Sequence, residues 1–321
     1  MISAVLLAGD RVASKPIENE NKAFLEFRGS PLFIHVIRAL LSSTHVGKIV
    51  IVGPAERLKR ALEKEALPEA PDHPILVADQ GANLIENTLV GFFTSIDVPV
   101  KEDIEEQFDE YADSEFREVP VLVLSCDIPL LTPWEVDEFI DGSDVSSFDY
   151  FIGMSDESVM AAFEPAGELP GIVMSCYHLA EGRCRHNNLH LGKPLKLTGM
   201  HHIERMYELR YQKRMINMFK LILRILAARG NAGAALRLFI TMQLARSRGE
   251  RRRGKFYRFL RSRNSQNKVL EIISSILGLR ANAVFTRYGG AVVDVDNAHD
   301  LHAAEERYEE WMDLQRAIHD E

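Results

Sequence analysis

Two aspartates, Asp127 and Asp296, occupy similar positions in the sequence: each ends a strand-like apolar run and each precedes a short polar turn and an expected helix. The two runs are 119–127 and 291–296. If both runs belong to one sheet, the carboxylates lie at its carboxyl edge and can share a hard cation such as Mg²⁺, which prefers oxygen ligands and keeps several waters. We therefore predict a Mg²⁺ site at these two residues and phosphoryl or nucleotidyl chemistry around it.

The amino-terminal segment predicts a place for phosphate. Residues 2–7 form an apolar run typical of a buried strand. The run passes into Ala8, Gly9, Asp10 and Arg11, and Lys22 follows after a polar stretch. A strand, a glycine turn and cationic side chains can form a phosphate cradle from backbone N–H groups and positive charge. A glycine after a strand is by itself more often a plain turn, so this interpretation depends on its combination with the two aspartates.

These segments resemble the MobA-like nucleotidyltransferases, the family of molybdenum cofactor guanylyltransferases and sugar-phosphate nucleotidyltransferases. The matching segments are residues 5–11, 21–36, 124–131 and 293–301, and the resemblance covers roughly residues 1–200 and 283–321. It implies that the first loop, with Leu7, Ala8 and Gly9, binds the triphosphate. It also implies that Arg11 and Lys22 are catalytic residues that hold phosphate, and that Asp127 and Asp296 bind Mg²⁺.

A further polar segment, 80–87, has two interpretations. Asn83 followed three residues later by Glu86 is typical of a capping box, so a helix is expected to begin there. The family counterpart of this segment also recognises the nucleobase, which implies that Gln80, Gly81, Asn83 and Asn87 are nucleotide-binding residues. An amide can pair with guanine or with cytosine, so GTP and CTP are both expected substrates and the base stays open.

Polar and cationic residues between the Asp127 segment and residue 201 suit a phosphorylated acceptor. The resemblance places the acceptor pocket in this part of the chain, and we predict that Arg185, Asn187, Lys193 and Lys196 line it. A sugar phosphate, a polyol or lipid-precursor phosphate, and molybdopterin all remain open as acceptors. The histidines nearby lack an acidic cluster that would complete a zinc site.

The elements that must position these residues alternate along the chain. Strands are expected at 2–7, 49–52, 75–78 and 119–125, and helices at 31–43, 56–65, from 84 onward, and at 133–140. This order predicts an α/β fold with a doubly wound, mostly parallel sheet of Rossmann type, with ligands beyond the carboxyl ends of the strands. The resemblance implies the nucleotide-diphospho-sugar transferase version of that fold. The acidic stretch 101–118 is expected to be a surface helix or loop.

Composition is consistent with an intracellular enzyme. A chain of 321 residues can bury a large core. Its three cysteines are an odd number without metal-like spacing, so we expect reduced thiols and a cytoplasmic protein. The sequence shows no signal-peptide pattern and no apolar run of bilayer-spanning length.

Charge is strongly segregated along the sequence. Residues 204–268 contain eighteen Lys and Arg against three Glu, a net charge of +15, so the remainder carries −24 to give the total of −9. We predict a basic helical insertion at 201–282 within a nucleotidyltransferase domain formed by 1–200 and 283–321. Its apolar stripes favour either packing on the sheet with a solvated basic face, or peripheral binding to an anionic membrane surface on the cytoplasmic side. No motif indicates nucleic-acid binding.

The expected reaction is Mg²⁺-dependent transfer of a nucleoside monophosphate from a nucleoside triphosphate to a phosphorylated acceptor, with release of pyrophosphate. The acceptor phosphate is already an anionic nucleophile, so alignment and charge neutralisation suffice. The first loop departs from the family pattern, because Asp10 and Arg11 follow Gly9 at once and the stretch to Lys22 is long. This motivates an alternative, a catalytically degenerate nucleotide-binding or membrane-associated regulatory module. An oligomer is compatible with either.

Overall fold

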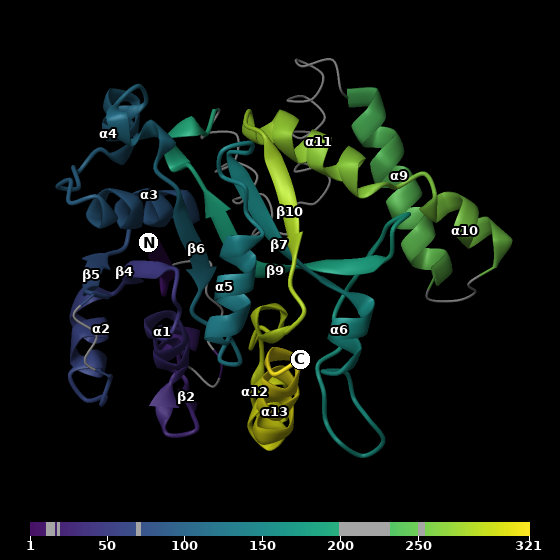
Figure 1. Cartoon of the computed structure of the whole chain (residues 1–321), viewed down its shortest axis with the longest axis horizontal. Helices are drawn as coiled ribbons and strands as arrows, with labels where there is room; N and C mark the ends of the chain where they lie inside the picture. The colour runs from purple at the N-terminus through teal and green to yellow at the C-terminus, as the bar shows by residue number, and fades with distance from the viewer. Residues whose placement is uncertain (11–16, 18–19, 69–71, 199–231, 250–253) are drawn as a thin grey trace.

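A computed structural model describes residues 1–10, 17, 20–68, 72–198, 232–249 and 254–321 (Figure 1). Arg11 and parts of the basic segment, 199–231 and 250–253, lie outside the described residues. The strands are β1 (Ile2–Leu7), β2 (Glu26–Phe27), β3 (Ser30–Pro31), β4 (Val46–Gly53), β5 (Ile75–Asp79), β6 (Val121–Ser125), β7 (Tyr150–Asp156), β8 (Tyr177–His178), β9 (Arg183–Gly192) and β10 (Ala281–Phe285).

The helices cover the sheet and extend from one of its edges (Figure 1). The α-helices are α1 (Leu32–Leu41), α2 (Ala55–Leu62), α3 (Leu84–Ser95), α4 (Ile104–Tyr111), α5 (Pro133–Asp141), α6 (Glu157–Ala161), α9 (Ala232–Gly249), α10 (Lys255–Arg261), α11 (Gln266–Leu277), α12 (Ala298–Glu306) and α13 (Tyr308–His319). Short 3-10 helices are η1 (Lys22–Phe24), η2 (Glu115–Glu118), η3 (Pro194–Lys196) and η4 (Gly290–Val292).

The main sheet has the strand order β10-β7-β9-β6-β1-β4-β5, and β8 pairs with β9 as its eighth strand. The pairs β1–β4, β1–β6, β4–β5 and β10–β7 are parallel. Strand β9 is antiparallel to β6, β7 and β8. The prediction of a mostly parallel α/β sheet is confirmed, and the antiparallel insertion of β9 is a feature that the sequence did not indicate.

Side chains of β1 enter two separate cores. Ala4 and Leu6 are fully buried in a cluster with α1, α2 and α5, whereas Val5 is fully buried in a cluster with α3 and α4 on the other face. A strand covered on both faces consists of a continuous apolar run, as residues 2–7 do. The expected strands and helices up to residue 140 are confirmed as β1, α1, β4, α2, β5, α3, β6 and α5.

The acidic stretch 101–118 is confirmed as surface structure, with the addition of an apolar face. It forms α4 and η2, and Asp103 caps α4 by accepting from the Glu106 backbone N–H at 2.9 Å. Ile104 and Phe108 are buried against the cluster that contains α3. The acidic side chains therefore lie on the outside of a helix that covers the sheet.

The prediction of a strand ending at Asp296 is wrong. The run is preceded by Gly289, which is in the left-handed region at φ +86°, and its first residues belong to η4. A Cβ at Gly290 would lie 2.1 Å from the carbonyl oxygen of Leu130, so only glycine allows the backbone to pack this closely. The apolar side chains of the run, such as Val293, are buried in a cluster with α12 and α13 instead of in the sheet.

The described part of the basic insertion is helical and joins the sheet at its end. Helices α9, α10 and α11 lead into β10, whose first residue, Ala281, pairs with Tyr150 of β7. The sheet therefore resumes at residue 281, two residues before the expected boundary at 283. No helix among the described residues is long and apolar enough to cross a membrane.

Candidate active site

Asp127 lies two residues after the end of β6 and is 9% exposed. Its position is set locally, because the Ser125 hydroxyl donates to one carboxylate oxygen, Oδ1. Its backbone carbonyl accepts from the N–H of Val295 at 2.9 Å. This bond joins the turn after β6 to the segment that carries Asp296, although that segment is not a strand.

Lys22 brings the two predicted metal ligands together. Its Nζ donates to Oδ2 of Asp127 at 3.0 Å and to Oδ1 of Asp296. Burial disfavours the charged ammonium, but the two carboxylates more than offset this, and the pKa of Lys22 lies well above its ordinary value. The lysine is therefore a fixed positive charge at the carboxyl edge of the sheet.

The Lys22 segment is also attached to the first loop. Asn21 caps η1 by accepting from the Ala23 backbone N–H at 2.7 Å, and its side-chain amide donates to the carbonyl oxygen of Gly9 at 3.3 Å. The glycine turn after β1 and the lysine that begins η1 are thus held beside each other. The arginine expected to act with them, Arg11, lies outside the described residues.

The donor set at this edge fits Mg²⁺. Two carboxylates from separate segments converge on one point cation, the Lys22 ammonium, which stands in for a cation between them. Among the described residues, no three carboxylate, imidazole or thiol groups form a metal-binding cluster. Mg²⁺ commonly uses one or two protein carboxylates and takes its other ligands from water and substrate phosphate, so two carboxylates are sufficient.

A third carboxylate, Asp294, lies near the other two and was not predicted. Nη2 of Arg185 donates to its Oδ1 at 3.0 Å and to its Oδ2 at 3.4 Å. Burial raises the pKa of Asp294, Arg185 lowers it, and the nearby charges of Asp296 and Asp127 raise it again, to about 6. The alternation Asp294-Val-Asp296 was the signal that could have indicated it.

The residues predicted to bind the nucleotide converge beside the first loop. Ala8 continues from Leu7 and donates its N–H to Val52 at 2.8 Å, and a Cβ at Gly9 would meet the side-chain amides of Gln80 and Asn87, each at 3.1 Å. Gly9 therefore lies directly against the loop after β5. This close approach explains why a residue without a side chain occurs there.

The loop after β5 is stabilised by its own amide groups. Oε1 of Gln80 accepts from the Asp10 N–H at 2.9 Å, and its Nε2 donates to the Asp10 carboxylate. The Asn87 side-chain oxygen accepts from the Gly81 N–H at 2.7 Å. The Asp10 carboxylate therefore points toward the Gln80 amide. This hydrogen bond partly compensates its negative charge, which lies close to the expected phosphate site.

The capping box at the start of α3 is confirmed with one difference. Asn83 accepts from the backbone N–H groups of Ile85 and Glu86 at 2.9 and 3.0 Å. The Glu86 carboxylate accepts from the Asn83 side-chain amide at 2.9 Å and from the Ala82 N–H at 2.7 Å. In the usual capping box it would accept from the backbone N–H of the cap residue instead. The Asn83 side chain thus has a structural role at the helix start.

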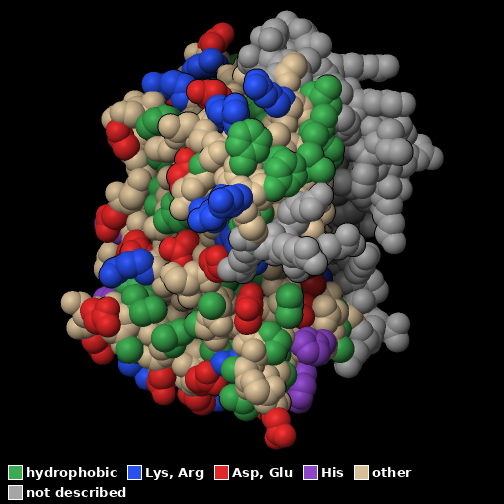
Figure 2. Space-filling model, turned by 90° about the vertical axis from the view of Figure 1, so that its right-hand side faces the viewer, with side chains coloured by type: hydrophobic (Ala, Val, Ile, Leu, Met, Phe, Trp, Pro, Cys, Tyr) green, Lys and Arg blue, Asp and Glu red, His purple; other side chains and the backbone are tan. Residues whose placement is uncertain are grey.

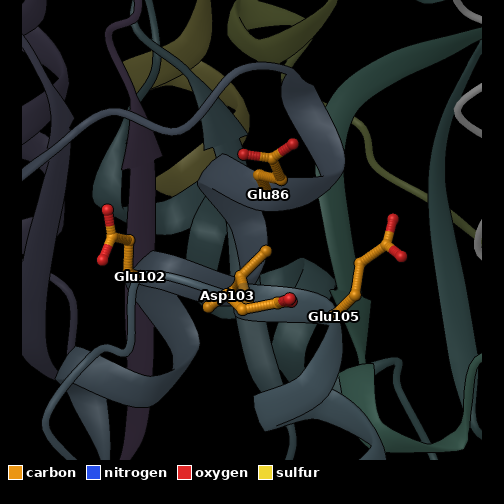
Figure 3. A pocket seen from close by; sticks show the side chains of 5 residues that line it. Glu86, Glu102, Asp103 and Glu105 are labelled. Atoms are coloured by element: carbon orange, nitrogen blue, oxygen red, sulfur yellow. The ribbon is translucent and has the colours of Figure 1, made fainter.

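A hollow beside this helix start is acidic (Figure 3). It has a volume of about 520 Å³ and is lined by Glu86, Glu102, Asp103, Ile104 and Glu105. Glu86 and Asp103 serve as helix-capping groups, as described above. Four carboxylates repel a triphosphate, so the phosphates are expected on the Lys22 side of the loop and not in this hollow.

The predicted acceptor residues separate into two groups. Gly192 of β9 pairs with Val121, the first residue of β6, so Lys193 and Lys196 lie at the opposite edge of the sheet from the aspartates. The Lys193 side chain is 6% exposed and pairs with Glu118 at 2.6 Å. The structure therefore does not bring these two lysines to the candidate site, because the antiparallel direction of β9 takes its end away from it.

Asn187 and Arg185 lie at the nearer end of β9. Asn187 is 1% exposed, and its amide donates to the Thr286 hydroxyl at 3.3 Å while its oxygen accepts from the Leu189 N–H at 3.1 Å. Its polar atoms are thus used inside the protein. Arg185 retains partial exposure beside Asp294, and it is the predicted acceptor residue that the structure brings to the aspartates.

Glu135 is a buried residue that supports the site from behind. It accepts from the Thr286 hydroxyl at 2.7 Å and from the N–H groups of Gly289 and Ala291 at 3.3 and 2.8 Å. These bonds fix the segment that leads to Asp294 and Asp296. Sequence reasoning missed it, since a glutamate in the first turn of a helix is ordinarily a surface residue.

Residues 4–220 match the MobA-like NTP transferase domain family. The chain belongs to this family. It is therefore a nucleotidyltransferase, as the resemblance implied. The matched residues include Lys22 and Asp127, whereas Asp294 and Asp296 lie beyond the matched range and reach the same edge through the fold.

One solved structure shows the same fold. A hypothetical transferase structure from Thermus thermophilus overlays with a TM-score of 0.60 at 22% identity, covering 94% of this chain and 99% of the other. Two further overlays are looser. A CMP:2-keto-3-deoxy-manno-octonic acid synthetase complexed with CTP gives a TM-score of 0.43 at 11% identity, covering 97% and 99%. A 4-diphosphocytidyl-2C-methyl-D-erythritol synthase from Anaerococcus prevotii gives 0.45 at 9%, covering 96% of each chain. No curated protein matches the chain.

Proposed function

We propose that this nucleotidyltransferase transfers a nucleoside monophosphate from a nucleoside triphosphate to a phosphorylated acceptor, with release of pyrophosphate, and that it requires Mg²⁺. The observation that carries this proposal is the convergence of Asp127, Asp296 and Lys22 at one point of the sheet edge. Two acidic groups and one fixed cation beside a glycine turn suit a triphosphate and its metal ion.

Lys22 would hold the phosphates. Its high pKa keeps the ammonium charged throughout the neutral range, and it lies on the segment that Asn21 ties to Gly9. When a triphosphate and a metal ion enter, the ammonium can exchange a carboxylate for a phosphate oxygen over a short distance. A fixed positive charge there stabilises the negative charge that collects on the departing pyrophosphate.

Asp127 and Asp296 would hold Mg²⁺ through their carboxylate oxygens. When bound, the ion supplies electrostatic stabilisation and alignment of the phosphates. The chain contributes the rigidity of this site. The Ser125 hydroxyl fixes the Asp127 carboxylate, and the Val295 to Asp127 backbone bond fixes the segment that carries Asp296, so little backbone reorganisation would accompany the reaction.

Arg185 would bind the acceptor phosphate. Within the described part of the chain its guanidinium uses one nitrogen, Nη2, on Asp294. The remaining nitrogens can donate to a phosphate in the paired geometry that favours arginine at such sites. The acceptor phosphate would then lie on the β9 side of the aspartates, across from the glycine turn after β1, as in-line attack on the α-phosphorus requires.

The nucleobase would lie against the loop after β5. Gly9, Gln80, Gly81 and Asn87 form one surface there, and the amides of Gln80 and Asn87 are oriented by bonds to Asp10 and Gly81. Amide and backbone groups of this kind can pair with guanine or with cytosine. GTP and CTP are therefore the two triphosphates to test first.

The decisive experiment is a pyrophosphate-release assay with Mg²⁺. Each of GTP, CTP, ATP and UTP is combined with sugar phosphates, polyol phosphates and molybdopterin, and release is compared with and without a chelator. The proposal expects release with one triphosphate and one acceptor class, lost on chelation. Nucleotide binding measured by calorimetry, together with no release for any pair, would instead support the degenerate nucleotide-binding module.

A further inference from the structure

Helix α9 has apolar side chains on two faces. The inner face contains Leu238 and Ala245, which are 8% and 0% exposed. The outer face presents large apolar side chains at helical spacing, and they stay between 38% and 46% exposed: Leu236, Phe239, Ile240 and Leu244. A helix that only packs on the sheet needs one apolar face, so the outer face requires another explanation.

Helix α10 repeats this arrangement. Its inner residues Tyr257 and Leu260 are 4% and 5% exposed and pack with Ala245 of α9. Its outer residues Phe256 and Phe259 are 54% and 52% exposed. Exposed phenylalanines on two adjacent helices form an apolar surface of the kind that marks an interaction site.

Helix α10, on which α9 packs through Ala245, is attached to β8 and the residues that follow it. The Tyr257 hydroxyl and Nδ1 of His178 in β8 share a hydrogen bond of 2.9 Å. Arg261 donates to the carbonyl oxygen of Ala180 at 3.1 Å, and the Ala180 N–H donates to Asn264 at 2.8 Å. The outer apolar side chains are therefore presented on a fixed support.

Positive charge surrounds this apolar surface. Between residues 232 and 270 the sequence has eleven Lys and Arg, and Glu250 is the one acidic residue. In the part of the chain that the structure describes, Arg237, Lys255 and Arg258 form no ion pair with a carboxylate. Figure 2 shows hydrophobic side chains gathered in the upper part of the face that contains α9 and α10, with Lys and Arg side chains beside them.

We propose that the outer face of α9 and α10, here called the α9–α10 face, binds the surface of an anionic phospholipid membrane. Phenylalanine and leucine side chains enter the boundary between headgroups and acyl chains, and lysine and arginine side chains contact the lipid phosphates. Nucleic acid explains the charge but leaves the exposed leucine and isoleucine side chains without a role. A membrane surface explains both features with one occupant.

This attachment would also bear on the candidate site. Strand β8, which contacts α10 through His178, pairs with β9 at Cys184, the residue before Arg185. The α9–α10 face is therefore connected through β8 to the end of β9 that carries Arg185. The proposal itself concerns binding and is independent of the reaction, because it is measured without nucleotide or acceptor.

The test is co-sedimentation of the full chain with vesicles of phosphatidylcholine alone or of phosphatidylcholine with phosphatidylglycerol, at low and high salt. We expect binding to the anionic vesicles that weakens at high salt. Two double variants test the apolar and the cationic side chains separately. Phe256→Ser with Phe259→Ser removes apolar side chains, and Lys255→Glu with Arg258→Glu reverses positive charges. Each is expected to weaken binding at least tenfold.

Matched controls lie elsewhere on the surface. Val173→Ser changes an apolar side chain that is 80% exposed, and Arg60→Glu with Lys64→Glu reverses two exposed charges. Both controls are expected to bind vesicles like the unchanged protein, and all variants are expected to keep its thermal transition. Controls that lose binding as strongly as the face variants would overturn the proposal.

Two other outcomes would also overturn it. One is equal or negligible sedimentation of the unchanged protein with both vesicle types. The other is a competing occupant of the face. A DNA duplex would be indicated if it binds more tightly than anionic vesicles and if the phenylalanine variants do not change this binding. A second copy of the chain would be indicated if those variants dissociate a dimer and no vesicle binding is seen. Sedimentation velocity and a duplex-binding titration measure these two cases.

Discussion

The backbone N–H of Val295 donates to the carbonyl oxygen of Asp127 at 2.9 Å. These residues are far apart in the sequence, and the bond fixes the turn after β6 against the segment from η4 to α12. The carboxylates of Asp127 and Asp296 meet at the Lys22 ammonium because their backbones are joined in this way. The candidate site is therefore assembled by a contact between two loops at the sheet edge.

Removing either carboxylate is expected to abolish turnover without unfolding the protein. Asp127→Asn and Asp296→Asn each keep the shape of the side chain and remove the charge needed for Mg²⁺. We expect at least a hundredfold loss of pyrophosphate release, which corresponds to about 2.7 kcal/mol. Asp97→Asn, a change of an exposed aspartate paired with Lys48, is the control. Near-normal activity of either site variant would remove that residue from the metal site.

Lys22→Ala is expected to weaken triphosphate binding and slow the reaction. The loss should correspond to a charged hydrogen bond, about 1.5–3 kcal/mol. Among the described residues, no second cation contacts Asp127 or Asp296 and could replace the ammonium. Lys48→Ala, which removes a partly exposed lysine paired with Asp97 at 2.7 Å, is the matched control. Titration calorimetry and single-turnover rates measure the two effects, and unchanged values would place the phosphate cradle elsewhere.

The part of this site that could be predicted is the part carried by local patterns. The glycine turn and Asp127 follow apolar strand runs, and parallel strands place their carboxyl ends at one edge, whereas the role of Lys22 came from the family resemblance. Asp296 was expected there for a reason that the structure does not support, since its run forms η4 and not a strand. The glycines at 289 and 290 cause this difference, because they allow a turn packed closely on Leu130.

The remainder depends on strand direction, which the local sequence does not indicate. Arg185 reaches Asp294, a contact across 109 positions, because β9 runs antiparallel between β6 and β7. The same direction takes Lys193 and Lys196 to the opposite edge. Residues that are close in sequence, all cationic and all plausible for an acceptor phosphate, are thereby separated by the length of one strand.

Arg185→Ala is expected to raise the KM for the phosphorylated acceptor at least tenfold and to change the KM for the triphosphate little. The guanidinium lies on the β9 side of the aspartates and offers paired donors to a phosphate. Lys193→Ala tests the other end of the strand. It is expected to leave both KM values unchanged and to lower thermal stability, since it breaks a pair with Glu118. Equal effects of the two variants on acceptor KM would contradict the assignment.

The last prediction concerns the pH dependence of stability through Glu135. Burial raises the pKa of this carboxyl from 4.5 to about 7, although its hydrogen bonds from Thr286, Gly289 and Ala291 oppose the shift. Because the folded-state pKa is higher than the unfolded one, the unfolded chain releases this proton first as pH rises. The contribution of Glu135 to the free energy of unfolding is then complete below pH 4.5 and is lost as pH rises to about 7.

Glu135→Gln stays neutral at every pH and provides the comparison. The stability of the variant relative to the unchanged protein should increase between pH 4.5 and 7 by up to about 3 kcal/mol, at about 1.4 kcal/mol for each unit of pKa shift. Urea unfolding at a series of pH values measures this difference. Parallel stability curves for the two proteins would show that the pKa of Glu135 is not raised in the folded state. The three groups that donate hydrogen bonds to its carboxylate would then stabilise the ionised form by more than burial destabilises it.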